Sequence, residues 1–349
     1  MRTLILSAGR FGSPLREKIA LGREPRLDMY ELQAALKADL LDFGDVDASV
    51  KPAVRLVRRA AGSSAALAVL GATRAADYDA ILTSGEDIGL PLAVLLLGRR
   101  KAPAHTLISH TLTPWKKRLF FHLLPIQRRI DRLLCYASSE ERHIVEKLGM
   151  PAAKVRRIAY HADVQFFRPA DEAREPDLLC AAGQLLRDYD SLVEAVRGQP
   201  VRLRIAAGSP WIASEMRPGS ALPPNVEWRR YDRFELRELY ARSSVAVVPL
   251  LQNDYQTGIS TILEMMAMGK CVIATRTRGQ TDTIVDGVTG IYVPPGDPIA
   301  LREAIAKALA QPDEAKRIGE AARRFVEKEA SLERFVARIA ETVRESVAS

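Results

Sequence analysis

Short runs of apolar residues, each followed by a longer stretch of helical periodicity, repeat along most of the chain. Runs that are apolar at nearly every position are typical of strands in a parallel sheet, because helices cover both faces of such a sheet. The alternation of strand and helix therefore predicts a doubly wound α/β architecture. The predicted strands lie at residues 3–8, 38–43, 79–84, 105–109, 131–138 and 155–160 in the first half, and at 177–183, 201–208, 225–231, 245–250, 271–275 and 290–295 in the second.

The length of 349 residues exceeds an ordinary single domain and suits two. Residues 166–178, rich in proline and charge, are the natural linker between them. After Pro312 the periodicity is helical to the end of the sequence. We therefore expect an N-terminal Rossmann-like domain at residues 1–168 and a C-terminal Rossmann-like domain at 169–330, with a cleft between them. A final helix at about 331–349 is expected to cross back onto the first domain.

The composition favours a globular protein of a reducing compartment. Hydrophobic residues make up 47% of the chain, but no apolar run is long enough to span a bilayer, and residues 91–98 fall far short. The apolar N-terminus runs straight into a glycine loop, so we interpret it as a buried strand and not as a signal peptide. The three cysteines, Cys135, Cys180 and Cys271, lie far apart in strand-like contexts without metal-ligand spacing. Buried thiols in the cytoplasm are the expectation.

The basic charge is concentrated in one segment. The net charge is +8, and residues 1–165 hold 26 Lys and Arg against 17 Asp and Glu, whereas the remainder is nearly neutral. Residues 99–132 alone contain nine basic side chains and one acidic side chain, Asp131. A basic nucleic-acid-binding protein is the competing class of function. The absence of a recognition motif, and the confinement of the excess to one segment, count against it.

Residues 256–270, QTGISTILEMMAMGK, lie between two predicted strands and form the helix of a parallel crossover. Gly258 allows close backbone approach, and Ser260 and Thr261 are expected to open the helix as cap-type residues. The free N–H groups and the dipole at that end favour a phosphate. Glu264, one turn later on the same face, could accept two hydroxyl hydrogen bonds from a ribose. A partly solvated helical glutamate with no ligand is the alternative.

This segment, with GQTDTIVDGVTGIYVPPGD after it, resembles the donor-binding region of the large retaining GT-B glycosyltransferase family. The hallmarks of that family are Glu-x7-Glu, then Ala-Met-Ala-x-Gly-x-Pro-Val-Ile-Ala, then Asp-Gly-x-x-Gly. HADVQFFRP is similar to the family's Gly-Val-Asp-x-x-x-Phe-x-Pro, and AAGQLLRDYDSLVEA to its Gly-Arg…Lys-Gly unit in an Arg-Asp-Tyr variant. The resemblance covers most of the chain and is strongest over residues 155–310. It implies a GT-B fold and transfer of a sugar from a nucleoside diphosphate to a glycan, lipid-linked or small-molecule acceptor, with retention.

Carried over to this sequence, the resemblance implies that Glu264 holds the donor ribose and that Arg187 holds the diphosphate with the backbone of residues 258–261. Gln184 stands where the family usually has Arg. Gln256 replaces the family's first Glu, so it can bind the donor sugar and serve as a catalytic candidate but carries no charge. That replacement leaves open both the sugar and the choice between retention and inversion. The implied donor-binding residues are Gly9, Gly12, Gln184, Arg187, Gly208, Gly258, Ile259, Ser260, Thr261 and Glu264.

Two further candidates lie in the first half. Gly9 and Gly12 follow the first predicted strand, where a tight turn without a ligand is the alternative to the family's use of this loop for the donor phosphate. His110 follows the strand at 105–109. A lone histidine there is compatible with a purely structural role. The resemblance implies a catalytic histidine that orients the donor sugar or the acceptor.

No metal or other cofactor is expected. Three Asp-x-Asp pairs occur, at residues 45–47, 77–79 and 188–190, and this pattern binds Mg or Mn in the other major glycosyltransferase fold. A chain with 20 Asp residues produces such pairs by chance, so they are weak evidence. A helix N-terminus and Arg187 can stabilise a diphosphate leaving group without a metal. A sugar-nucleotide epimerase of the GT-B fold is the alternative enzyme.

Residues 115–134 combine clustered Lys and Arg with Trp, Phe and Leu. This composition suits an interfacial helix on an anionic membrane, which would make the protein peripheral on the inner face. The alternative is a pair of amphipathic helices, broken at Pro125, and we expect their apolar side chains to pack inward. For the basic face, an anionic membrane surface and an acidic acceptor both stay open.

Overall fold

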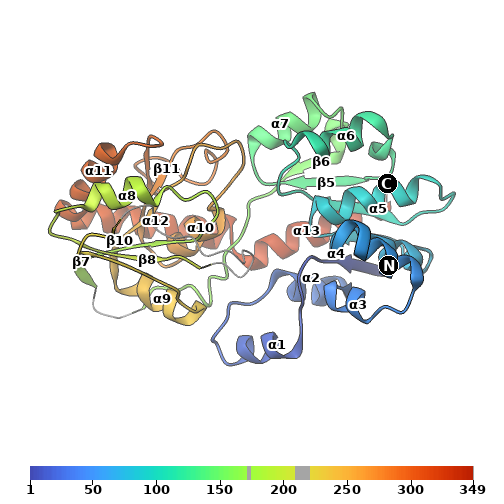
Figure 1. Cartoon of the computed structure of the whole chain (residues 1–349), viewed down its shortest axis with the longest axis horizontal. Coiled ribbons are helices and arrows are strands. Elements are labelled where there is room, and N and C mark those ends of the chain that lie inside the picture. Colours follow the sequence, from blue (N-terminus) through green and yellow to red (C-terminus); the bar gives the residue numbers. More distant parts are fainter. Residues whose placement is uncertain (171–173, 209–220, 349) are drawn as a thin grey trace. The chain divides into compact units, whose positions relative to one another are not determined.

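The computed structural model describes residues 1–170, 174–208 and 221–348 and divides into two compact units (Figure 1). Unit 1 contains Met1–Glu17, Arg26–Ile158 and Phe335–Ser349, and unit 2 contains Lys18–Pro25 and Ala159–Arg334. Each unit holds one six-stranded sheet in which every strand pair is parallel. The predicted doubly wound α/β fold with two sheets is confirmed.

The limits of the units differ from those expected from the sequence. The chain enters unit 2 at Ala159, before the proposed linker at residues 166–178. Phe166 and Phe167 are buried in the core of unit 2, and the first strand of its sheet already begins at Glu175. Residues 171–173 of the proposed linker lie outside the described residues.

The sheet of unit 1 has the strand order β2-β1-β3-β4-β5-β6. Strands with neighbours on both sides are buried along most of their length: Leu4, Ile5 and Leu6 of the second strand in this order are all buried. The strands are β1 Thr3–Leu6, β2 Asp39–Leu41, β3 Ala80–Thr83, β4 Ala104–Ile108, β5 Arg132–Cys135 and β6 Val155–Arg157. The helices are α1 Ser13–Ala20, which crosses into unit 2, α2 Asp28–Leu36, α3 Phe43–Ala48, α4 Pro52–Arg74 with a break at Gly62, α5 Glu86–Leu97, α6 Trp115–Leu123 and α7 Ser138–Glu146.

The sheet of unit 2 has the strand order β12-β11-β10-β7-β8-β9. Side chains along its central strand alternate between two cores: Leu179 and Ala181 face one cluster, and Leu178, Cys180 and Ala182 face the other. The strands are β7 Glu175–Ala182, β8 Arg202–Ala206, β9 Val226–Arg229, β10 Ser243–Val248, β11 Cys271–Thr275 and β12 Ile291–Val293. The helices are α8 Tyr189–Val196, α9 Arg233–Arg242, α10 Ile259–Ala267, α11 Pro298–Ala310 and α12 Pro312–Glu329. The last helix, α13 Leu332–Ala348, begins in unit 2 and belongs to unit 1 from Phe335 onward.

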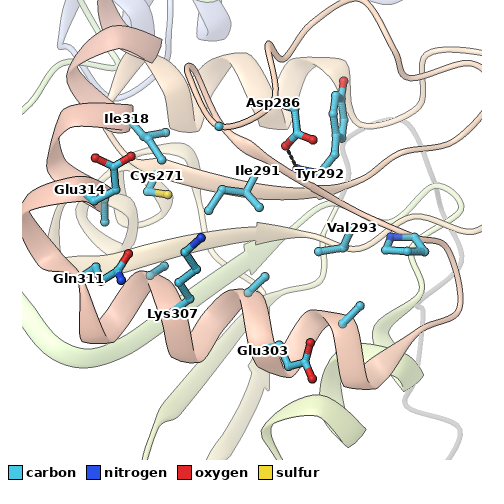
Figure 2. Close-up of a pocket in the computed structure, with 16 residues that line it drawn as sticks. Cys271, Asp286, Ile291, Tyr292, Val293, Glu303, Lys307, Gln311, Glu314 and Ile318 are labelled. Carbon is cyan, nitrogen blue, oxygen red and sulfur yellow. Dashed lines mark hydrogen bonds between the residues drawn. The ribbon is translucent and has the colours of Figure 1, made fainter.

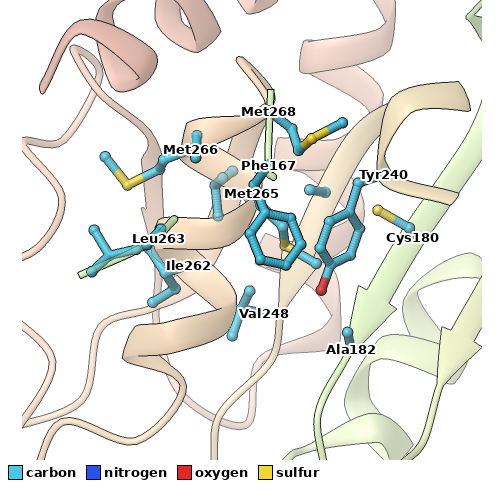
Figure 3. Close-up of a cluster of buried hydrophobic side chains, with 14 of the residues drawn as sticks. Phe167, Cys180, Ala182, Tyr240, Val248, Ile262, Leu263, Met265, Met266 and Met268 are labelled. Atoms are coloured by element: carbon cyan, nitrogen blue, oxygen red, sulfur yellow. The ribbon is translucent and has the colours of Figure 1, made fainter. Parts of the chain in front are cut away.

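Helix α10 is buried on nearly every side, which explains its apolar composition. Met265, Met266 and Met268 pack with Phe167 and Tyr240 in one cluster, as Figure 3 shows. A helix that is apolar on nearly all sides is buried in a core. A carboxylate in such a helix loses most of its hydration and needs a hydrogen-bond or ion-pair partner within the protein. The surroundings of Glu264 therefore need a specific explanation.

The basic segment differs from the expected pair of helices. Helix α6 ends before Pro125, and only a 3₁₀ turn, Ile126–Arg128, follows before β5. The expectation of inward packing holds for the buried side chains Phe121, Ile126, Ile130, Leu133 and Leu134. It is wrong for Trp115, Leu119, Leu123 and Leu124, which are exposed. No helix among the described residues is both long and apolar enough to cross a membrane.

Candidate functional site

The order of strands reverses between β7 and β10 in unit 2, and ligands of doubly wound sheets bind beyond the carboxyl ends of such strands. The loops that leave these two strands lie against each other. Leu251 N donates to Leu186 O at 2.9 Å, and Asp188 N donates to Pro249 O at 3.1 Å. Arg187 also forms an isolated bridge with Leu250. The fold thus brings the candidates at residues 184–187 and 256–264 to one edge of the sheet.

Arg187 is buried at this edge with its guanidinium fixed in place. Nε donates to Ala182 O at 2.9 Å, Nη1 to Leu185 O at 2.9 Å and Nη2 to Thr261 Oγ1 at 3.1 Å. Burial lowers the pKa of Arg187 from its usual value. Gly183, with φ +96°, makes room for this group, because a Cβ there would lie 2.2 Å from Nη2. A cation is therefore held at the first turn of α10.

The N-terminus of α10 carries no side-chain cap, which corrects the expectation for Ser260 and Thr261. The N-cap residue is Gly258 with φ +78°, and the described residues provide no side-chain hydrogen bond to this end. Thr261 Oγ1 accepts from Arg187 instead. The backbone bond from Ile262 N to Gly258 O, 2.9 Å, closes the first turn. An uncapped first turn beside a guanidinium suits a phosphate group.

Glu264 is 8% exposed and forms an ion pair that the sequence analysis missed. Its Oε1 accepts from Arg233 Nη1 at 3.0 Å. Burial raises the pKa of Glu264, and Arg233 acts against that rise. Arg233 is the first residue of α9, where Asp232 and Glu235 form a capping box. The capping box can be recognised in the sequence, but no sequence pattern predicts a contact between Arg233 and Glu264.

Gln184 and Gly208 lie at the same edge. Gly183 N and Gly208 N both donate to Ala206 O, at 3.2 and 3.1 Å, so the ends of β7 and β8 are adjacent. Gln184 follows Gly183 directly and is buried. Gly208 is the last described residue before the gap at residues 209–220.

Gln256 lies in the loop just before Ile259, the first residue of α10. Its Oε1 is buried, and no hydrogen-bond partner for it exists among the described residues. The loop around it is rigid: Asn253 Nδ2 donates to Thr257 Oγ1 at 2.8 Å, and Gln280 Nε2 donates to Thr257 O at 3.1 Å. A buried acceptor without a donor is uncommon and indicates a place where a ligand or water can bind.

The first-half candidates lie at the carboxyl edge of the other sheet, in unit 1. Gly9 O accepts from Phe43 N at 2.9 Å, and Phe11 N donates to Asp42 Oδ2 at 2.6 Å, so the loop folds against the start of α3. Gly12 O accepts from Leu15 N at 3.1 Å in the first turn of α1. These contacts explain the loop as a tight turn.

His110 is exposed at the end of β4 with its ring fixed on one side. Nε2 donates to Ser84 O at 3.0 Å, and Ser84 Oγ accepts from Ala8 N at 3.0 Å, so Ser84 connects His110 to the loop after β1. Because the carbonyl requires a proton on Nε2, a neutral His110 presents Nδ1 as its acceptor. That nitrogen is available for a substrate hydroxyl.

Two buried carboxylates that the sequence analysis missed hold the segment around His110. Glu86 Oε2 accepts from His110 N at 2.9 Å, while its Oε1 binds Lys117 Nζ at 2.6 Å. Glu140 Oε1 accepts from Ser109 Oγ at 2.7 Å and from Leu112 N at 3.2 Å. Burial raises the pKa of Glu140 to about 7, with a smaller contribution from Glu86.

The Asp-x-Asp pairs have structural partners. Asp47 pairs with Arg10 at 2.9 Å, Asp79 Oδ2 accepts from Arg2 N at 2.7 Å, and Asp188 caps α8. Within the ranges that the structure describes, no three His, Cys, Asp or Glu side chains cluster as metal ligands would.

A separate cavity of about 520 Å³ opens between α11, α12 and the strands β11 and β12, as Figure 2 shows. Its lining includes Cys271, Lys307 and Glu314, and none of the candidate site residues contributes to it.

Residues 179–311, which contain the unit 2 site, match the family model described as glycosyl transferases group 1. Among curated proteins, the D-inositol 3-phosphate glycosyltransferase of Kribbella flavida is 27% identical over 236 residues, with 55% of this chain and 51% of that protein covered. The alpha-D-kanosaminyltransferase of Streptomyces kanamyceticus is 25% identical, with 67% and 65% covered. The matched region spans about half the length of the D-inositol 3-phosphate glycosyltransferases, 46% and 51% in two of them.

Solved structures show the same fold over the whole chain. HepE of Anabaena in complex with UDP-glucose has a TM-score of 0.70 and 13% identity and covers 98% of this chain and 99% of its own. Sucrose-phosphate synthase of Thermosynechococcus elongatus has a TM-score of 0.72 and 18% identity, with both chains covered fully, 100% each. The two sheets with their flanking helices form a GT-B fold.

Proposed function

We propose that this protein is a glycosyltransferase of the hexosyltransferase type, which moves a sugar from a nucleoside-diphosphate sugar to an acceptor. The observation that carries the proposal is the uncapped N-terminus of α10 with Arg187 against its first turn and Glu264 one turn further on. The family match over residues 179–311 includes all of these groups and supports the proposal.

Each group has a role that fits one part of the donor. The N–H groups of the first turn of α10 and the guanidinium of Arg187 bind the diphosphate and stabilise its charge as it leaves. Glu264 accepts hydrogen bonds from the ribose hydroxyls, and the ion pair with Arg233 opposes the rise in the pKa of Glu264 that burial causes. The unpartnered Oε1 of Gln256 accepts from a sugar hydroxyl.

The reaction uses no metal and no other cofactor in this proposal, because the leaving diphosphate has a helix N-terminus and Arg187 to meet its charge. Retention at the sugar is proposed on the resemblance to the Glu-x7-Glu family. Gln256 in place of the first Glu leaves no charged side chain at that position. The anomeric configuration of the product, compared with that of the donor sugar, therefore decides between retention and inversion.

His110 orients the donor sugar or the acceptor in this proposal, with Nδ1 as the acceptor atom. Gly9 and Gly12 belong to the loop after β1, which Ala8 N joins to Ser84. The acceptor is a glycan, a lipid-linked sugar or a small molecule. Three free, buried cysteines support a reducing compartment, and we propose the cytoplasm. The GDP-mannose-dependent alpha-(1-6)-phosphatidylinositol monomannoside mannosyltransferase of Mycolicibacterium smegmatis, 25% identical with 67% of this chain covered, supports a nucleotide-sugar donor.

A donor-hydrolysis screen tests the proposal. UDP-, GDP- and ADP-sugars are incubated with the wild type, with Glu264→Gln and with the control Glu303→Gln, which changes an exposed glutamate on α11. Glycosyltransferases hydrolyse their donor slowly without an acceptor, so one donor should release nucleoside diphosphate and free sugar. The Glu264 variant should be slowed and the control should not. Formation of an epimerised sugar nucleotide instead would contradict the proposal.

A further inference from the structure

Helix α6 exposes a continuous apolar stripe. Trp115, Leu119 and Leu123 are 60%, 39% and 72% exposed, and their four-residue spacing puts them on one side of the helix. Leu124, directly after the helix, is 36% exposed. Single exposed apolar side chains are ordinary, but one on each successive turn of a short helix forms a patch that a partner would cover.

The opposite side of α6 is anchored in unit 1, so the stripe faces outward. Phe121 is buried, and Lys117 forms an ion pair with Glu86 at 2.6 Å and with Asp87 at 3.2 Å. At about 100° per residue, both side chains lie roughly half a turn away from the stripe. Lys117 is therefore a structural residue, although it belongs to the same basic cluster in the sequence.

The basic side chains that stay exposed border the stripe. Lys116 and Arg118 are exposed, and the helical angle puts them on either side of it. Lys116 Nζ lies 5.8 Å from the centre of the Trp115 ring. The pKa of His143 on the next helix is lowered by burial and then by the charges of Arg118 and Lys147.

We propose that α6 docks on an anionic lipid bilayer, with Trp115, Leu119 and Leu123 at the boundary between headgroups and acyl chains and Lys116 and Arg118 on the headgroups. The apolar stripe, with a tryptophan at one end, suits the acyl-chain region of a bilayer. The cations along both sides of the stripe suit its anionic headgroups. An acidic soluble partner would use the cations but would leave the stripe uncovered. The inference concerns a lipid surface and holds independently of the sugar transfer proposed above.

Flotation with vesicles tests this surface. The full-length protein is mixed with vesicles of equal parts phosphatidylglycerol and phosphatidylcholine, or of phosphatidylcholine alone, over a series of salt concentrations. The charge variant is Lys116→Ser with Arg118→Ser, and the apolar variant is Trp115→Ser with Leu119→Ser and Leu123→Ser. Lys117 is kept in both variants because its ion pair with Glu86 holds the helix.

Matched controls come from exposed positions of unit 2. Lys316→Ser with Lys328→Ser removes the same charge, and Val285→Ser with Ile299→Ser removes apolar surface from 56% and 65% exposed side chains. Because nucleotide and vesicles are added in separate assays, a failure of donor hydrolysis leaves the flotation result unaffected.

The wild type should float with the anionic vesicles only, and less as salt rises. The charge variant should bind about 25-fold more weakly, at roughly fivefold for each of its two charges. The apolar variant should bind at least tenfold more weakly, and both controls should bind like the wild type. Wild-type protein that stays at the bottom at low salt would overturn the inference. Equal losses of vesicle binding in the charge variant and its control would also overturn the inference. A wild-type dimer in sedimentation that only the apolar variant dissociates would do the same.

Discussion

Replacing Glu140 by Gln should change how the stability of the protein depends on pH. Glu140 is buried at the start of α7, and the charged or polar groups around its carboxyl are Ser109, the N–H of Leu112, Glu86 and Lys117. Burial is the main reason that its pKa rises from the ordinary 4.5 to about 7. The folded protein therefore keeps this proton over a pH range in which the unfolded chain has already released it.

The sign and the size of the effect follow from that difference. A folded-state pKa above the unfolded value contributes stability that is fully present below about pH 4.5 and is lost as the pH rises through about 7. The full difference corresponds to about 3 kcal/mol in the free energy of unfolding, of which about 2–3 kcal/mol falls between pH 5 and pH 8. Glu140→Gln keeps an acceptor for Ser109 and Leu112 but removes the titration.

Urea unfolding followed by circular dichroism at pH 5 and pH 8 measures the effect. From pH 5 to pH 8, the wild type should lose about 2–3 kcal/mol relative to the Glu140→Gln variant. Glu141→Gln is the matched control, since Glu141 is 38% exposed and lies 3.7 Å from Arg157. That variant should differ from the wild type equally at both pH values. The reasoning fails if the difference between the wild type and Glu140→Gln is the same at pH 5 and pH 8.

Three further results are expected at the donor site. Gly183→Ala should lower the nucleotide affinity measured by calorimetry, because the new Cβ would lie 2.2 Å from the Arg187 guanidinium. The control Gly198→Ala is also at positive φ but has open space around it, so it should lose only about 1 kcal/mol of stability. Arg233→Met should raise the pKa of Glu264 further, so that UDP or GDP affinity falls more steeply from pH 8 to pH 5 than in the wild type. Turnover should survive EDTA, and a loss that Mg or Mn restores would refute the metal-free reaction.

Elements set by local pattern could be predicted from the sequence. Every predicted strand exists. The inner strands are runs of residues that are buried almost throughout, such as Ala80–Thr83 and Cys271–Thr275, whereas the edge strands β2, β6 and β9 are partly exposed. Gly258 could be found from its place between an apolar strand and a helix, and Arg187 from the resemblance to the GT-B family. The strand order, which places both loops at the point of reversal, comes from the structure.

Contacts between distant elements could not be predicted. The ion pair of Arg233 with Glu264 joins residues 31 positions apart in the sequence, and so does the hydrogen bond that Ser109 Oγ donates to Glu140. Neither contact leaves a periodic signal. Thr261 was expected to cap its helix, but a buried guanidinium competes for its hydroxyl oxygen.

The central claim is that the N-terminus of α10 binds a nucleoside diphosphate and that Glu264 holds its ribose. Calorimetric titration of UDP, GDP and ADP into the wild type, Glu264→Gln and the control Glu303→Gln tests it most directly. We predict that at least one of the three binds the wild type, that Glu264→Gln weakens this binding by about 1.5–3 kcal/mol, or tenfold to hundredfold, and that the control does not. Failure of all three nucleotides to bind, or equal affinity in the wild type and Glu264→Gln, would contradict the account.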